Sequence, residues 1–176
     1  MPKFKQFSLL NRWKYFGSEK YRFQINVRTV LEERISGQKI TNDNTNPYSV
    51  NIDNTIFQIY TKFGKIIDNN QNIGSQTSVS LHDQFSQFGE NVYNLRQESF
   101  SFNLIKEDKK NRKTLKYGSS FFGDRFTNNT NIIDSSKIKR RVDLVSGLFS
   151  EYQSSFKKIN VIAGVRADYY NVQNKI

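Results

Sequence analysis

The chain has 176 residues, no cysteine, and a formal net charge of +11 from 27 Lys and Arg against 16 Asp and Glu. This length fits one domain or part of a larger one, since domains usually contain about 50 to 250 residues. A transmembrane helix needs about 20 consecutive apolar residues, whereas the apolar runs here are short, as at 161–163, so a helical membrane protein is excluded. The lack of cysteine excludes disulfides, thiolate zinc sites and cysteine nucleophiles.

An alternation of apolar and polar residues predicts eight strands along the chain. In 21–31 the odd positions from Phe23 to Leu31 are apolar or Thr, while the even positions from Arg22 to Arg28 are polar. A period of two is typical of a strand with one apolar and one polar face, and the 15 Phe and 9 Tyr favour strands over helices. The strands are predicted at residues 5–16, 21–34, 49–66, 74–87, 91–105, 113–127, 138–155 and 159–171.

The strand predicted at 91–105 changes its pattern part of the way along. Tyr93 and Leu95 have one parity, whereas Phe100 and Phe102 have the other, and the change falls near Gln97. An extra residue inserted in one strand would switch the faces in this way, so the pattern predicts a β-bulge.

The strands are long, and the segments between them alternate in character. Compact polar turns are predicted at 17–20, 106–112 and 156–158, and longer Asn- and Ser-rich segments at 36–48 and 128–137. By its place in the alternation 68–74 belongs with the compact turns although it is long, and 88–89 belongs with the longer segments although it is short. Strands that exceed the usual 5 to 6 residues or so and reach the roughly 9 to 11 that cross a bilayer, with unequal loops at their two ends, are typical of outer-membrane barrels. We therefore predict an all-β, antiparallel, up-and-down transmembrane β-barrel segment.

The polar mean hydropathy of −0.70 is compatible with this prediction, because half of each strand would face a polar lumen. Aromatic residues near the predicted strand ends would form the girdles that lie at membrane interfaces. They are Trp13, Tyr15, Tyr48, Phe88, Phe126, Tyr152, Phe156, Tyr169 and Tyr170.

Several segments resemble a known family in their order and spacing. They are 10–16 (LNRWKYF), 31–38 (LEERISGQ), 80–89 (SLHDQFSQFG), 147–152 (GLFSEY) and 162–171 (IAGVRADYYN). Together they resemble barrel strands of TonB-dependent outer-membrane receptors of the Bacteroidetes type. The resemblance implies a parent protein in which a signal peptide and a plug domain precede a barrel of about 22 strands.

Measured against that family, residues 1–176 are expected to form a partial outer-membrane β-barrel, with no plug domain and no signal peptide. Residues 1–5 (MPKFK) lack the charged-then-apolar pattern of a secretory signal, and the last residues, 174–176, lack a terminal aromatic. An internal barrel fragment leaves two strand edges unpaired, so an open, curved sheet is expected.

The resemblance also implies a function in the outer membrane of a Gram-negative bacterium. Such a receptor imports a scarce nutrient such as an iron chelate, cobalamin or an oligosaccharide. Its partners would be outer-membrane lipid and lipopolysaccharide, its own plug domain and remaining strands, and the TonB energy-transducing complex. No cofactor, metal or nucleic acid is expected, and the chain is not expected to be an enzyme.

Two groups of charged residues are candidate contact sites. Arg22, Arg28, Arg166 and Asp168 fall on the predicted lumen side, where they would contact the plug or an anionic substrate, or would be solvated charges without individual roles. Lys137, Lys139, Arg140 and Arg141 lie at the start of the seventh strand, near the predicted outer rim. They would attract lipopolysaccharide or a ferric chelate through a long-range field, or would be a solvated loop end.

Catalytic and metal-binding patterns are weak. His82 is the one histidine, and Asp83 beside it points to the opposite face of a strand, whereas metal sites combine several ligands. Two alternatives remain open: a soluble, basic β-sheet protein that binds single-stranded nucleic acid through exposed aromatic and basic side chains, and a complete eight-stranded outer-membrane barrel.

Overall fold

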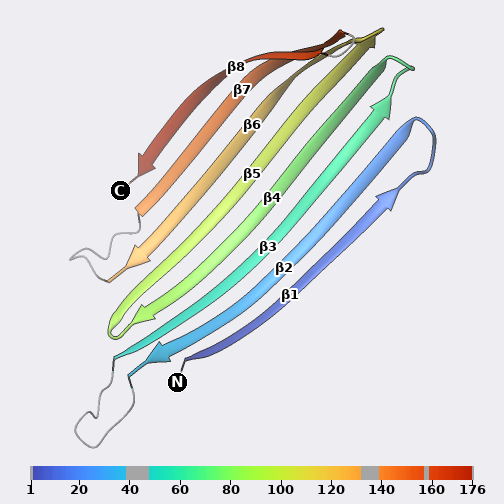
Figure 1. Ribbon diagram of the computed structural model, residues 1–176. Helices are drawn as coiled ribbons and strands as arrows, with labels where there is room; N and C mark the ends of the chain where they lie inside the picture. The colour runs from blue at the N-terminus through green and yellow to red at the C-terminus, as the bar shows by residue number, and fades with distance from the viewer. Residues whose placement is uncertain (1, 39–47, 132–138, 157–158, 176) are drawn as a thin grey trace, which may run out of the picture.

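The computed structural model describes residues 2–38, 48–131, 139–156 and 159–175, which form one antiparallel sheet (Figure 1). The sheet order is β1 to β8 without a crossover. This confirms the predicted eight strands and the up-and-down topology. No helix in these ranges is long and apolar enough to cross a membrane. The strands are β1 (Lys3–Tyr15), β2 (Tyr21–Gly37), β3 (Ser49–Ile66), β4 (Gln71–Phe88), β5 (Asn91–Lys110), β6 (Lys113–Thr130), β7 (Lys139–Phe156) and β8 (Ile159–Lys175).

The register is continuous across the whole sheet, so every strand residue can be assigned to one of two faces. Residues paired across neighbouring strands share a face, and the pairing runs without a skipped residue from Lys3↔Ile35 to Phe156↔Ile159. Odd positions of β1–β4, β6 and β8 and even positions of β5 and β7 form what we call the apolar face. The remaining strand positions form the polar face.

The β-bulge predicted near Gln97 is wrong. β5 pairs with β4 and β6 at constant offset, from Phe88↔Asn91 to Gln71↔Asp108 and from Tyr93↔Thr130 to Lys110↔Lys113. The parity changes because the side chains change, not the backbone: toward the start of β5 the apolar face carries charged residues and the polar face carries Tyr93 and Leu95.

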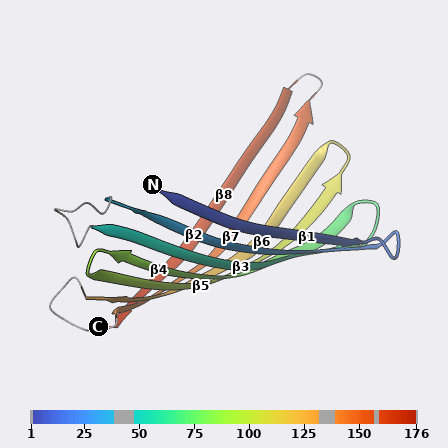
Figure 2. The ribbon, with the colours of Figure 1, turned by 90° about the horizontal axis from the view of Figure 1, so that it is seen from below.

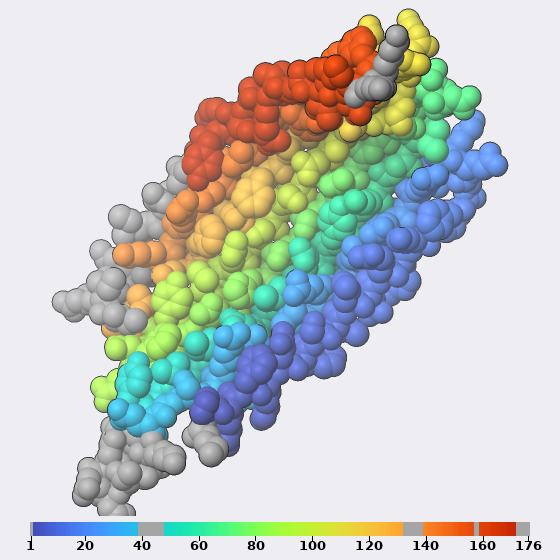
Figure 3. All heavy atoms as spheres, in the orientation of Figure 1, coloured from blue at the N-terminus to red at the C-terminus, as the bar shows by residue number. Residues whose placement is uncertain are grey.

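The sheet is open and strongly twisted. β1 and β8 form its two edges, and in the view of Figure 2 the first and last strands cross at a wide angle. This confirms the expected open, curved sheet and excludes a closed eight-stranded barrel for the described residues. Figure 3 shows one face of the sheet, on which the strands follow one another in diagonal bands from the N-terminal to the C-terminal strand.

Burial identifies the concave side of the sheet. Five side chains in the described residues are buried, and four of them, Val30, Ser86, Asp124 and Asp143, lie on the polar face. Large apolar-face side chains remain open, for example Phe63 at 43% and Leu148 at 68% exposure. Because a curved sheet crowds side chains on its inner side, the polar face is the concave one.

The connections give the two ends of the sheet different characters. At one end, the short-turn end, lie 16–20, 67–70, 111–112 and 157–158; at the other, the long-loop end, lie 38–48, 89–90 and 131–138. Gly89 (φ 62°) and Asn111 (φ 55°) begin the two-residue turns, where the left-handed conformation suits Gly and Asn.

The segment 106–112 predicted as a turn is mostly strand, because β5 continues to Lys110. Its charges neutralise one another along each face, with Lys106–Asp108 at 3.6 Å and Lys109–Glu107 at 2.9 Å.

Candidate functional site

The polar face carries a lattice of side-chain hydrogen bonds, and this makes it the candidate functional surface. Arg12 Nε donates to Asn26 Oδ1 (3.2 Å), and Gln24 Nε2 donates to the same oxygen (3.1 Å). Further along the sheet, Asn54 Nδ2 donates to Glu32 Oε1 (3.1 Å). Gln97 Nε2 lies 3.4 Å from both carboxylate oxygens of the buried Asp124. A concave surface with this many polar groups can hold a hydrated partner.

Arg166 and Asp168 form one unit on the polar face of β8. Arg166 Nε donates to Asp168 Oδ2 (2.8 Å), and Arg166 Nη2 reaches across β7 to Ser120 Oγ on β6 (2.8 Å). The guanidinium can cross an entire strand because Gly147, the register partner of both Ser120 and Asp168, has no side chain. A Cβ at Gly147 would collide with Asp168 and would lie 2.9 Å from both Arg166 Nη2 and Ser120 Oγ.

Gly147→Ala is therefore expected to destabilise the sheet by about 1–3 kcal/mol, the usual cost of overpacking. Urea unfolding in detergent micelles measures this difference. Gly164→Ala is the matched control on the same face, because its Cβ would meet Ser150 O at an ordinary 3.5 Å. Equal losses in the two variants would show that Gly147 is not needed for the crossing of Arg166.

The four predicted lumen residues share the polar face but form two separate groups. Arg22 and Arg28 lie on β2, close to one edge of the sheet, and Arg166 and Asp168 lie on β8, the other edge. Three more cations surround the first group: Arg12 and Lys14 on β1 and Lys62 on β3. We call the set Arg12, Lys14, Arg22, Arg28 and Lys62 the inner basic patch.

The predicted rim cluster is divided by the sheet. Lys139 and Arg141 lie on the polar face and Arg140 on the apolar face, while Lys137 lies outside the described residues. Arg141 holds the buried Asp143 with two bonds, Nε to Oδ1 at 2.8 Å and Nη2 to Oδ2 at 2.6 Å, and its Nη2 also lies 3.5 Å from Tyr170 Oη. Arg141 is thus held by Asp143 on its own strand, and the side chains of Lys139, Arg140 and Arg141 are all exposed.

On β2 to β6 the apolar face ends at a row of charges, which we call the charged boundary. It consists of Glu33, Asp53, Asp83, Glu98 and Arg125. Each lies twelve or thirteen residues from the short-turn end of its strand. Arg96 bridges Asp83 (3.8 Å) and Glu98 (3.1 Å), and Glu98 also pairs with Arg125. Between five and eleven residues from the short-turn end, the apolar face of β2 to β8 has no charged residue.

Aromatic side chains gather on the apolar face near the short-turn end. Trp13 is 54% exposed there, and the rings of Tyr21 and Phe63 lie 6.2 Å apart. Three residues predicted for the aromatic girdles, Phe88, Phe126 and Tyr170, lie instead on the polar face. The prediction used only their closeness to strand ends, whereas the parity of each position decides which face its side chain is on.

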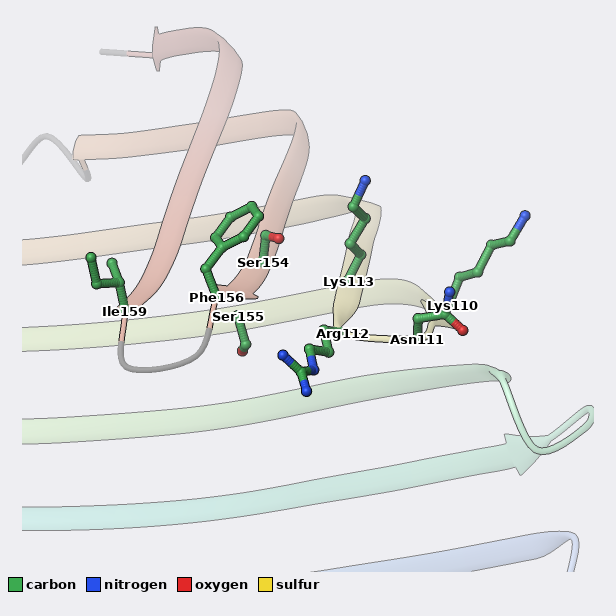
Figure 4. A pocket seen from close by; sticks show the side chains of 8 residues that line it. All are labelled: Lys110, Asn111, Arg112, Lys113, Ser154, Ser155, Phe156 and Ile159. Atoms are coloured by element: carbon green, nitrogen blue, oxygen red, sulfur yellow. The ribbon is translucent and has the colours of Figure 1, made fainter.

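An open hollow of about 1020 Å³ lies at the short-turn end (Figure 4). Lys110, Arg112 and Lys113 line it from the β5–β6 turn, and Phe156 and Ile159 from the ends of β7 and β8. Cationic side chains beside exposed apolar ones suit a membrane interface. The residues that line this hollow include no pair of a nucleophile and a general base. Across the described residues no three His, Cys, Asp or Glu side chains gather as metal ligands, and His82 lies 3.5 Å from Asn54 Oδ1.

Sequence reasoning missed the residues that complete these groups. Ser120 and Gly147 are ordinary polar-strand residues in isolation, and Lys14 and Lys62 lie far apart in the chain. Parity carried from strand to strand through the hairpins would have placed Lys62 beside Gln24, which pairs with Lys14. The register was the missing information.

Comparison with known proteins gives matches among solved structures alone. No protein-family model matches the chain, and no curated protein does. The copper transporter OprC matches with a TM-score of 0.79 and 11% identity over 98% of this chain and 29% of its own. The alcaligin outer-membrane receptor FauA from Bordetella pertussis matches at 0.77 and 10% over 98% and 29%, and the ferric citrate transporter FecA, unliganded, at 0.55 and 9% over 87% and 27%.

The eight strands thus have the fold of a segment of an outer-membrane β-barrel. That barrel is the one found in TonB-dependent receptors, of which the three matched proteins are examples. The chain spans less than a third of each of them. Two of the three matched proteins are transporters by name and the third is an outer-membrane receptor.

Proposed function

We propose that this chain is part of the barrel wall of a TonB-dependent outer-membrane receptor that imports a scarce nutrient. The observation that carries the proposal is the charge-free band of the apolar face, which ends at the charged boundary while the concave face is polar and hydrogen-bonded. A barrel that spans a membrane requires this division between its lipid side and its lumen.

The height of the band supports the proposal. On β5 the stretch between Glu98 and Lys106 is eight residues, about 26 Å along a strand at about 3.3 Å per residue and about 20 Å high at a tilt of about 40°. On β3 the stretch between Asp53 and Lys65 is twelve residues, which by the same arithmetic is about 30 Å high. These values bracket the roughly 25 Å apolar band of outer-membrane barrels.

In this function the chain supplies wall and rim. Loops at the long-loop end would capture the solute outside the cell, and a plug domain in the lumen would bind it and be displaced by energy from the TonB complex. Lipid and lipopolysaccharide would cover the apolar face and its charged boundary. The names of two of the three matched proteins mention copper and ferric citrate, so a metal chelate is the first substrate class to test, ahead of cobalamin or an oligosaccharide.

A nucleic-acid role has less support. Base stacking requires aromatic rings among the cations. In the described residues the inner basic patch is accompanied by Tyr60 on the polar face, 5.8 Å from Lys62 Nζ, and by Phe16, which lines the same hollow as Lys62. Most of the exposed rings of the short-turn half, such as Trp13 and Phe63, lie on the opposite face.

Trp13, the one tryptophan, tests the membrane placement. In vesicles of brominated lipid its fluorescence is expected to be quenched most by bromine near the headgroups, because Trp13 lies two residues from the short-turn end of β1. In a Trp13→Phe background, Val79→Trp on the apolar face is expected to be quenched by deep bromine, and the adjacent Ser78→Trp on the polar face only weakly.

Two results would contradict the proposal. One is equal quenching at positions 78 and 79, which would mean that the two faces meet the same medium. The other is a chain that folds in water without detergent as a soluble monomer with its apolar face buried.

A further inference from the structure

The inner basic patch differs from the rest of the polar face in having no counter-charge. Elsewhere on this face the described cations other than Lys139 pair with carboxylates, as in Arg34–Glu32 (2.7 Å), Lys116–Glu151 (3.3 Å) and Arg166–Asp168 (2.8 Å). None of the five cations of the patch forms an ion pair with any described residue. Unpaired like charges on a concave surface repel one another and concentrate anions.

The patch surrounds a depression with a bare backbone floor. Gly64 and Gly74 are register partners on the polar face, and a Cβ at Gly64 would meet nothing within 4 Å. The depression has a volume of about 320 Å³. Its lining combines polar and cationic residues with apolar ones, namely Lys14, Arg22, Gln24, Lys62 and Gln76 with Phe16, Phe23, Phe63 and Ile105. Two glycines side by side leave peptide groups accessible where three cations converge.

We propose that the inner basic patch binds an acidic polypeptide segment in extended conformation. The inference rests on the proposed function, in which the polar face encloses a domain that fills the barrel, and it names the chemistry of the part of that domain that lies against β1–β3.

The size of the patch favours a polypeptide over a small anion. Arg22 and Arg28 are six residues apart on β2, about 20 Å at about 3.3 Å per residue, and the patch crosses three strands spaced about 4.8 Å apart. A compact chelate could contact two or three of these cations at once, whereas an extended segment could contact all five.

The spacing of the cations also fits an extended chain. Arg12 and Lys14 are two residues apart on one face of β1, and acidic residues two apart on an extended peptide repeat at the same distance. Arginine can bind a carboxylate through two parallel hydrogen bonds, which makes the contact specific in direction as well as favourable in charge. Gln24, Asn26 and Gln76 provide amide groups between the charges.

The test is binding of a fluorescent peptide to the 176-residue chain folded in zwitterionic detergent micelles, followed by anisotropy. The probe alternates Glu and Ser, and a Lys/Ser peptide and citrate are the comparison ligands. Arg22→Gln with Lys62→Gln is expected to weaken binding of the Glu/Ser peptide by about 10- to 100-fold, since two charge-assisted contacts are lost.

Lys109→Gln with Lys116→Gln is the matched control, because it removes the same charge from the same face outside the patch. Less than about a twofold change is expected there, apart from general screening. Far-UV circular dichroism of each variant checks that the sheet persists, and Arg12→Gln with Lys14→Gln replaces the first pair if it does not.

Equal weakening by the two double variants would overturn the proposal, as it would show binding through net charge alone. Displacement of the peptide by citrate at equal charge concentration would also overturn it, in favour of a small-anion site. The two proposals can fail separately. Loss of peptide binding would leave the membrane placement reported by Trp13 quenching unchanged, and a failed quenching test would be seen without any peptide present.

Discussion

Phe102→Arg is expected to destabilise the membrane-inserted chain by about 2–4 kcal/mol, the cost of a cationic side chain at the middle of the lipid face of a barrel. Phe102 lies on the apolar face between Thr77 and Phe121, eight residues from the short-turn end of β5, within the charge-free band. Urea titration in lipid vesicles, followed by Trp13 fluorescence, measures the difference.

Asn103→Arg is the neighbouring control. Asn103 pairs with Gln76 and Ser120 on the polar face, where water can solvate a new guanidinium, so a loss of less than about 1 kcal/mol is expected for an exposed polar substitution. If the two variants lose the same stability, the two faces do not separate lipid from water and the barrel-wall function fails.

The open edges lead to the second large effect. β1 and β8 have one partner strand each, and an unpaired backbone group in lipid costs several kcal/mol. The 176-residue chain alone is therefore expected to associate edge to edge in a bilayer. Leu9→Cys with Val165→Cys reports this pairing in a chain without native cysteine, because both residues lie on the apolar face six residues from the short-turn end of their strands.

Oxidation is expected to give disulfide-linked dimers and larger species on a non-reducing gel. Leu9→Cys with Thr77→Cys is the control, since position 77 lies on β4 in the interior of the sheet and no edge-to-edge contact can reach it. A purely intramolecular bridge between positions 9 and 165 would instead show that the eight strands close on themselves.

Most of the fold was predictable from the sequence because strand parity is a local property. The alternation from Phe23 to Leu31 is enough to define β2 and its two faces. The prediction failed where function or environment altered the pattern. Charged residues from Lys106 to Lys110 imitate a turn although they extend β5, and the switch near Gln97 imitates a bulge although it marks the end of the apolar band.

The candidate site was less predictable, because its residues meet across strands. Arg166 could be assigned to the polar face from parity, but its bond to Ser120 depends on a glycine one strand away. The inner basic patch joins residues from β1, β2 and β3, and a strand assignment without register cannot bring them together.

The continuous register has a consequence for the path through the protein. The polar-face row that begins at Arg12, three residues from the short-turn end of β1, ends at Tyr170, eleven residues from that end on β8. The row thus shifts by eight residues along the strands over seven inter-strand spacings, which corresponds to an inclination of about 38° at about 3.3 Å per residue and about 4.8 Å between strands. This lies within the roughly 35–45° strand tilt of barrels.

Residues that are neighbours in register therefore follow an inclined line across the sheet, and side chains at one height belong to different rows. Arg28 on β2 and Arg166 on β8 are each seven residues from the short-turn end of their strands, so the two guanidinium groups stand at the same level although they belong to different rows.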